Sequence, residues 1–383
     1  MRNARAAPAV RRMAVDGGLL LLDASSGCLY AFNDAARHVW ELIEAGRSGE
    51  ALADEFAAWW GISVPRAQDD VASIVAQWRD LGLLDGFRRA APARSAPDDA
   101  AGCFRQPQAA TEWTCTIRGT VIRFAVENGV APTIRALFSH LETPDLRPRT
   151  RLEIRSAPGN EMLLTENGFE RIRTGDAGQM AGALQQAVLE RIHDNVDWLA
   201  LIHGAALARS GAGIGLAGPS GSGKSTLAAG LLKAGFDYLA DDMIALSAPD
   251  GAIMPWPLPL SIKPGSQDAV SARHPELAQA PRYRTKGLEA RLLVPPDSAW
   301  DAAPVKMRAL VFPSFIAGAA ADTQRISTFA AVERLLADRI WLGYPLTESR
   351  VSAFLTWLNV TPAHVITYGE LDDGVRLVEG VLR

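Results

Sequence analysis

The sequence has few cysteines, no long hydrophobic run and no large excess of charge, and each absence excludes a class of protein. Three cysteines in 383 residues are too widely spaced for a disulfide framework or a cysteine metal site; they are Cys28, Cys103 and Cys115. No apolar run is long enough to span a membrane and no signal peptide is evident, so we expect a cytoplasmic protein without a membrane partner. A net charge of −4 argues against a general nucleic-acid binder.

Length and composition indicate a folded protein of several domains. With 48% hydrophobic and 21% charged residues over 383 positions, the chain is globular and too long for one ordinary core. Shifts in composition predict a compact domain over residues 1–86, a linker over 87–110, a β-rich and helical middle region over 111–198, and a final domain over 199–383. A homo-oligomer is left open.

The first domain is predicted to be a small winged-helix-like α+β unit. Apolar residues over 19–22 and 29–32, separated by a Ser-Ser-Gly turn, predict a two-stranded ribbon. Three helices are expected to follow: from a cap at Asn33 or Asp34 to about Ala45, from about Gly49 to Trp60, and from about Pro65 to Gly82. The third helix begins with the acids Asp69 and Asp70 where a DNA-recognition helix would meet phosphates, which disfavours DNA binding.

Alternating apolar residues predict strands in the middle region, followed by a long helix. Strands are expected over residues 113–117, 121–126, 151–155 and 162–164, and the helix over about 178–198. The role of this region does not follow from the sequence.

A complete phosphate-binding loop, GPSGSGKST, occupies residues 218–226. It follows an apolar run over 213–217 that suits a buried strand, and it precedes an alanine- and leucine-rich stretch that suits a helix. Its glycines allow successive backbone N–H groups to face the phosphates of a nucleotide. Lys224 would reach the β- and γ-phosphates and Ser225 would bind Mg²⁺. The residues expected to bind the nucleotide are Gly218, Ser220, Gly221, Ser222, Gly223, Lys224, Ser225 and Thr226.

Two adjacent carboxylates follow this loop at the distance of a strand–helix–strand unit. Asp241 and Asp242 come at the end of the apolar run 236–240, where a P-loop fold places a metal-binding carboxylate. Together they can supply a metal anchor and a base, since repulsion between them can raise the pKa of one. The alternative is a solvated Asp-Asp turn. His203 lies upstream of the loop, and a lone histidine is more often packed or exposed than catalytic.

His203-Gly204, the loop 218–225 and Leu239-Ala240-Asp241-Asp242 together resemble the bacterial HPr kinase/phosphorylase family, which carries the same three elements at these separations. The resemblance implies an α/β P-loop kinase domain of the phosphoenolpyruvate-carboxykinase-like type, and a protein serine kinase that uses ATP (or another nucleoside triphosphate) with Mg²⁺. It implies that Asp241 is the base at the acceptor hydroxyl. It also implies that Asp242 either binds the metal with Ser225 or contacts one of its ligands, and that Lys224 and His203 are active-site residues.

The sequence departs from that family in two places. Thr226 stands where the family usually has glutamate, and the family's Glu-Ile-Arg-Gly-Leu-Gly segment is absent, the nearest stretch being residues 283–289. That segment helps to form the acceptor site and the hexamer in the family, so the acceptor and the oligomeric state stay open. Residues 260–266 resemble a segment of the divergent HPr-kinase-related proteins.

Residues 13–86 resemble the PqqD family in the hairpin over 19–32, the helix that contains residues 39–43, and the ending over 78–84. Members of that family bind the leader of a ribosomally made precursor peptide, which adds as a strand beside the β-ribbon and against the third helix. The resemblance implies a PqqD-like peptide-recognition domain as the N-terminal part of a multi-domain protein.

Taken together, the two resemblances predict an ATP-dependent kinase that phosphorylates a Ser or Thr hydroxyl of a precursor peptide held through its leader. Capture of the leader would raise the local concentration of the acceptor. Three alternatives stay open: a small-molecule or sugar kinase, a non-catalytic nucleotide-gated peptide chaperone, and a nucleotide-responsive DNA regulator.

Overall fold

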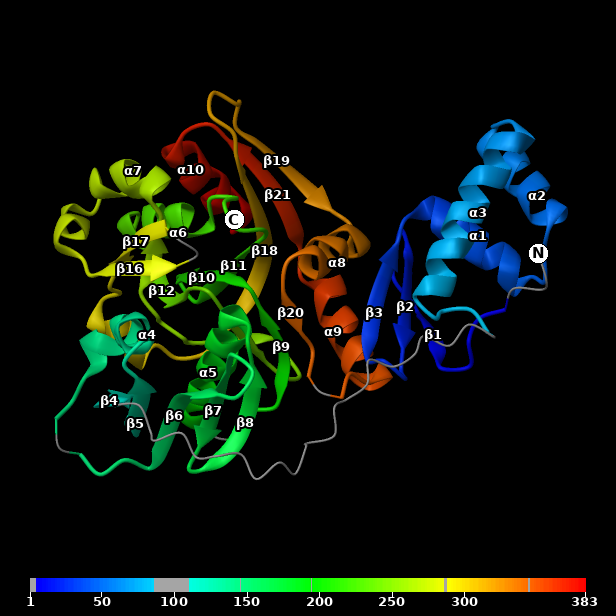
Figure 1. Cartoon of the computed structure of the whole chain (residues 1–383). Helices are drawn as coiled ribbons and strands as arrows, with labels where there is room; N and C mark the ends of the chain where they lie inside the picture. Colours follow the sequence, from blue (N-terminus) through cyan, green and yellow to red (C-terminus); the bar gives the residue numbers. More distant parts are fainter. Residues whose placement is uncertain (1–4, 86–109, 145, 194, 286–287, 344) are drawn as a thin grey trace. The chain divides into compact units, whose positions relative to one another are not determined.

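The computed structural model describes residues 5–85, 110–144, 146–193, 195–285, 288–343 and 345–383 (Figure 1). The chain forms two compact units, one of Met1–Ala101 with Ile326–Ala363 and one of Gly102–Arg325 with His364–Arg383. The linker predicted over 87–110 lies outside the described residues, except for its last residue. Within the described part of the chain, no helix is both long enough and apolar enough to cross a membrane.

The N-terminal part of the first unit confirms the predicted ribbon and three helices. Its elements are β1 (Val10–Met13), β2 (Leu19–Asp23), β3 (Cys28–Phe32), α1 (Asp34–Glu44), α2 (Glu50–Trp60) and α3 (Val64–Asp80). The Asn33 side chain accepts a hydrogen bond from the Ala36 amide and caps α1, as predicted. The prediction of two strands was wrong, because β1 pairs antiparallel with β2 through the short segment Val-Arg-Arg-Met. Only the two ends of that segment are buried, which is too weak a pattern to indicate a strand.

Strand β2 is buried on both faces. Successive side chains of a strand point to opposite faces, and Leu19 and Leu21 belong to the core formed with α1–α3. Leu20 and Leu22 are equally buried but point the other way.

The second face of the ribbon lies against two helices from the C-terminal half of the sequence. These are α8 (Thr328–Ala337), which packs against β3, and α9 (Glu348–Val360), which packs against β1. A β-carbon on Gly18 would lie 2.3 Å from the ring of Phe329. The short strand β20 (Ile340–Trp341) lies between these helices in the sequence. The domain predicted over 199–383 therefore contributes the segment 326–363 to the first unit.

The second unit is built on a large mixed sheet. Its strands are β9 (Trp198–Ile202), β10 (Gly204–Arg209), β11 (Ala212–Ala217), β12 (Asp237–Ala240), β13 (Ile244–Ser247), β14 (Ala252–Met254), β18 (Val305–Phe315), β19 (Asp322–Ile326) and β21 (Ala363–Tyr368). Neighbouring strands follow the order β12-β10-β11-β18-β14-β13-β9, and β21 pairs with β18 and β19. Strands β11 and β18 are parallel. Strand β11 is the strand that was predicted before the phosphate-binding loop.

Helix α6 (Lys224–Lys233) follows the phosphate-binding loop and packs against α10 (Leu371–Val381) and β10. A small sheet of β15 (Leu260–Ile262), β17 (Leu288–Leu293) and β16 (Arg282–Thr285) lies near it, with α7 (Gln267–Ser271). One apolar core joins these elements, and its members include Leu216, Leu227, Leu231, Leu260, Ile262 and Tyr368. The loop is therefore held between a buried strand and a buried helix.

The middle region confirms the predicted strands. It contains a five-stranded sheet in the order β4 (Ala110–Ile117), β5 (Thr120–Glu127), β6 (Thr150–Ala157), β7 (Glu161–Glu166) and β8 (Phe169–Thr174), with the helices α4 (Ala131–Phe138) and α5 (Ala177–Ile192). The helix predicted as far as residue 198 was too long, because α5 ends at Ile192 and Trp198 begins β9. Asn195, between them, has a left-handed φ of 63°, which a continuing helix does not allow.

Candidate functional site

The topology of the large sheet brings the three predicted segments to one edge. Strand β10 lies between β11 and β12 and runs antiparallel to both. Gly204, at its start, is opposite Ala217 at the end of β11, and Ala206 is opposite Ala240 at the end of β12. His203 precedes β10, the phosphate-binding loop follows β11 and the Asp pair follows β12. All three elements therefore meet at this edge.

The loop has a backbone shape that requires glycine. Gly218, Gly221 and Gly223 have φ angles of 134°, 95° and 100°, in the region that other residues rarely adopt. At Gly223 a β-carbon would also lie 2.7 Å from the hydroxyl of Tyr368. The glycine spacing read from the sequence is thus a requirement of the folded loop.

Lys224 is the first residue of α6, and its side chain is buried against the loop. It is only 8% exposed, and its ammonium group donates to the carbonyl oxygens of Gly218 and of Pro219, the latter at 3.1 Å. Ser225 and Thr226 are half-buried in the same first turn. A phosphate oxygen is a stronger acceptor than a carbonyl oxygen, so this lysine can exchange its present partners for a nucleotide.

Asp241 is a buried carboxylate whose environment suits a base. It is 5% exposed, and its Oδ2 atom accepts a hydrogen bond of 3.3 Å from the Ser261 amide. Burial, followed by the charge of Asp242, raises the pKa of Asp241 to about 7, while the Ser261 and Asp242 amides and the charge of Lys224 oppose this rise. A base with a pKa near neutrality accepts protons efficiently at physiological pH.

Asp242 joins His203 and a residue from the middle region. Its Oδ1 atom is 3.6 Å from His203 Nε2, and its Oδ2 atom accepts a hydrogen bond of 2.9 Å from Gln185 on α5. The Asp242 side chain is 52% exposed and His203 is 13% exposed. Asp242 has a left-handed φ of 65°. The two carboxylates therefore occupy different environments, as two different roles would require.

The glycine of the His-Gly pair is explained by packing. A β-carbon on Gly204 would lie 2.3 Å from the carbonyl oxygen of Leu216 in the neighbouring strand. Any other residue would push β10 away from β11 and would displace His203 from the sheet edge.

Three site residues were not predicted from the sequence: Gln185, Ser261 and Lys263. Lys263 follows β15, and its ammonium group donates to Ser220 Oγ in the phosphate-binding loop at 2.5 Å. The alternation Leu-Ser-Ile-Lys over 260–263 is a signal that could have indicated Ser261 and Lys263 as one polar face. Gln185 had no local signal, because only the tertiary fold brings α5 to Asp242.

The residues around the loop suit a phosphate ligand with Mg²⁺. The hydroxyls of Ser222 and Tyr368 are buried and have no hydrogen-bond partner within the described residues, which is costly unless a ligand satisfies them. The oxygens of Ser225 and Asp242 are of the kind that Mg²⁺ binds, usually with phosphate oxygens and water. In the described part of the chain, no group of three His, Cys, Asp or Glu side chains is placed to hold a metal ion. ATP and Mg²⁺ stay predictions.

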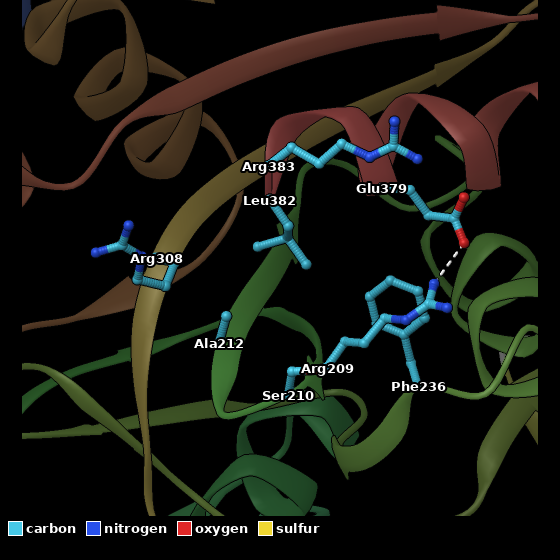
Figure 2. Close-up of a pocket in the computed structure, with 8 residues that line it drawn as sticks. All are labelled: Arg209, Ser210, Ala212, Phe236, Arg308, Glu379, Leu382 and Arg383. Atoms are coloured by element: carbon cyan, nitrogen blue, oxygen red, sulfur yellow. Dashed lines mark hydrogen bonds and ion pairs between the residues drawn. The ribbon is translucent and has the colours of Figure 1, made fainter.

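Figure 2 shows a pocket of about 500 Å³. Several of its lining residues lie at the ends of β10, β11 and β12 that are opposite to the candidate site. The pocket is lined by Arg209 at the end of β10, Ala212 at the start of β11 and Phe236 just before β12. Arg209 pairs with Glu379 and lies over the Phe236 ring, as Figure 2 shows. These contacts give Arg209 a structural role within this unit.

The first unit carries a second candidate site along β3. This strand pairs with β2 on one side, and no strand of the described residues pairs with its other side. Tyr30 and Phe32 are half-buried on the face that packs toward α1–α3, and Phe32 contacts Trp78 of α3 edge-on at 5.5 Å between ring centroids. The unpaired edge offers backbone hydrogen bonds to an extended peptide, and the aromatic rings offer apolar contacts to its side chains.

Comparisons with known proteins bear on the first unit. Residues 18–84, from just before β2 to just after α3, match the family model for coenzyme PQQ synthesis protein D (PqqD). A solved structure described as TbiB1 in complex with the TbiA(beta) leader peptide aligns at 21% identity and a TM-score of 0.21, covering 22% of this chain and 99% of that chain. No curated protein matches the sequence. The chain therefore carries a PqqD-like domain in its first unit.

Proposed function

We propose that this protein is an ATP-dependent kinase that phosphorylates a Ser or Thr hydroxyl of a ribosomally made precursor peptide, which it captures by the leader. The observation that carries the proposal is that two kinds of site occur in the same chain. A PqqD-like domain accompanies a phosphate-binding loop and a buried carboxylate, Asp241, which meet at one edge of the large sheet. The domain supports a peptide substrate, and the second site supports phosphoryl transfer.

The proposed reaction assigns a role to each side chain at the sheet edge. The loop amides and Lys224 would hold the β- and γ-phosphates of ATP, and Ser225 with Asp242 would hold Mg²⁺. The acceptor oxygen would attack the γ-phosphorus as its proton passes to Asp241, and the bond to the bridging oxygen of ADP would break. His203 would orient Asp242 through the contact at 3.6 Å.

The leader would add as a strand to the unpaired edge of β3, with side chains directed at Tyr30, Phe32 and α3. Binding through the leader makes the transfer step effectively intramolecular, so a weak acceptor site is sufficient.

The direct test is intact-mass spectrometry of a precursor peptide encoded beside this gene, incubated with the protein, ATP and Mg²⁺. We expect the mass gain of one phosphoryl group, and we expect a much slower gain on the same peptide without its leader. A gain that persists with Lys224→Met would come from a contaminating kinase. No gain with bound ATP would contradict the proposal and favour a nucleotide-gated chaperone, and a gain on a sugar or metabolite alone would favour a small-molecule kinase.

Leader dependence is better tested by a point variant than by removing residues 1–86. Deletion would uncover the faces of α8 and α9 that pack on the ribbon and would disturb the chain for reasons unrelated to the leader.

We expect Tyr30→Glu to weaken leader affinity by about tenfold or more, since an aromatic contact in a peptide groove is replaced by a charge. ATP affinity should not change. The matched control is Trp59→Ala, which removes an aromatic ring that is 74% exposed on α2. Fluorescence anisotropy of a labelled leader peptide measures the leader affinity of both variants. Equal affinities for Tyr30→Glu and wild type would place the leader elsewhere.

A further inference from the structure

Strand β15 and the residue after it connect the candidate base with the phosphate-binding loop. The Ser261 amide donates to Asp241 Oδ2 at 3.3 Å, and Lys263 Nζ donates to Ser220 Oγ at 2.5 Å. Ser261 and Lys263 are two positions apart, so they lie on the same face of the extended chain. One short segment thus contacts both reacting parts of the site.

The backbone of this segment is fixed by its surroundings. Leu260 and Ile262, on the opposite face, are fully buried in the core that includes α6. Ser261 pairs with Leu292 of β17. Lys263 precedes Pro264, which restricts it to extended conformations, and it has φ −73° and ψ 158°. The direction of the Lys263 side chain toward the loop therefore follows from the fold.

Two ammonium groups contact the phosphate-binding loop at different places. Lys224 contacts the carbonyl of Gly218 at the buried end of the loop, and Lys263 contacts Ser220 at its exposed tip. A lysine ammonium is a flexible point charge with three donors, so it can follow a phosphoryl group as that group moves. During phosphoryl transfer, negative charge is spread over the oxygens of the γ-phosphoryl group. Lys224 alone does not stabilise all of this charge, so a second ammonium group lowers the activation free energy of transfer.

We propose, on the basis of the function proposed above, that Lys263 is a catalytic residue that contacts the γ-phosphoryl group during transfer. The contact of the Ser261 amide with Asp241 fixes the distance between Lys263 and the base Asp241. In the step, the acceptor oxygen bonds to the γ-phosphorus and the acceptor proton moves to Asp241. The bond from the γ-phosphorus to the β–γ bridging oxygen breaks, and ADP keeps that electron pair. Lys263 changes neither its charge nor its bonds and stabilises the γ-oxygens throughout.

The test replaces Lys263 by methionine, which keeps the length of the side chain without its charge. We expect Lys263→Met to slow transfer by about 10²–10³-fold, as for loss of one transition-state donor. We also expect the affinity for the non-hydrolysable triphosphate AMP-PNP with Mg²⁺ to fall about tenfold and the affinity for ADP to stay within about twofold, since ADP lacks the γ-group. Lys263→Arg should restore much of the transfer rate and of the AMP-PNP affinity. Lys306→Met, which removes an exposed lysine at the start of β18, is the matched control and should match wild type.

Calorimetric titration with AMP-PNP and ADP separates this inference from the proposed function. If the wild type phosphorylates no peptide, the proposed function fails, yet a selective loss of AMP-PNP affinity in Lys263→Met still assigns Lys263 to the γ-phosphate. Equal losses for ADP and AMP-PNP would make Lys263 a structural support of the loop, and no loss of either affinity or rate would overturn the assignment.

Discussion

Replacement of Asp241 by asparagine is expected to slow phosphoryl transfer by about 10²–10⁴-fold, the usual contribution of a general base. Asparagine keeps the size and the acceptor oxygen that receives the Ser261 amide, but it cannot take up the acceptor proton. Nucleotide binding should survive, since Asp241 is assigned to the acceptor. Single-turnover kinetics with radiolabelled ATP would measure the loss.

The pH dependence of the wild type should identify the same group. Burial and the charge of Asp242 raise the pKa of Asp241 to about 7 in the nucleotide-free protein. A base acts when deprotonated, so the rate should increase with pH through about 7 and then level off. The residual activity of Asp241→Asn should lack this rise.

Stability should change in the opposite direction to activity. The folded-state pKa of Asp241 lies above its unfolded value, so the folded state favours the protonated form and stability falls as pH increases from about 4 to about 7. Each pH unit in that window corresponds to about 1.4 kcal/mol. At pH 8 the Asp241→Asn variant should therefore be more stable than wild type and nearly inactive.

Asp242→Asn should give a smaller stability gain at pH 8, because the half-exposed Asp242 carboxylate is less costly to bury and its removal relieves only the repulsion that contributes to the raised pKa of Asp241. Thermal unfolding at pH 5 and pH 8 compares the two variants. A loss of stability in Asp241→Asn at pH 8 would mean that the carboxylate is held charged by favourable partners, and it would contradict the role of a base with a raised pKa.

The segments that carry short-range signals could be predicted from the sequence. The glycines of the loop 218–223 and the Asp pair stand in fixed relation to a strand and a helix, and the backbone angles at Gly218, Gly221 and Gly223 explain why the motif takes that form. Asn33 marked the start of α1 because its side chain caps the neighbouring amides.

The contacts that depend on tertiary packing could not be predicted. Gln185 reaches Asp242 from α5, 57 residues away in the sequence, and Lys263 reaches Ser220 across 43 residues. Neither residue type indicates a partner by itself. The four buried leucines of β2 were visible in the sequence, but only the fold identifies α8 and α9, more than 300 residues later, as the elements on their second face.

The largest stability effect is expected where the segment 326–363 packs on the ribbon. We expect Phe329→Ala to destabilise the first unit by about 3–5 kcal/mol, because it removes a buried ring. Gly18→Ala should cost about 1–3 kcal/mol, since its new methyl group would lie 2.3 Å from that ring. In the double variant the methyl group enters space that the ring has left, so the combined loss should be smaller than the sum by about 0.5–3 kcal/mol.

Hydrogen–deuterium exchange of the β2 amides measures these losses within the first unit alone, where unfolding of the whole chain would mix two transitions. Gly129→Ala is the control, because its β-carbon would meet open space and exchange in β2 should not change. Full additivity of Gly18→Ala and Phe329→Ala would mean that the two residues do not touch in solution. Coupling between them would instead make residues 326–363 part of one folded unit with the PqqD-like domain. Under the proposed function, variants of α8 or α9 would then alter leader binding without touching the phosphate-binding loop.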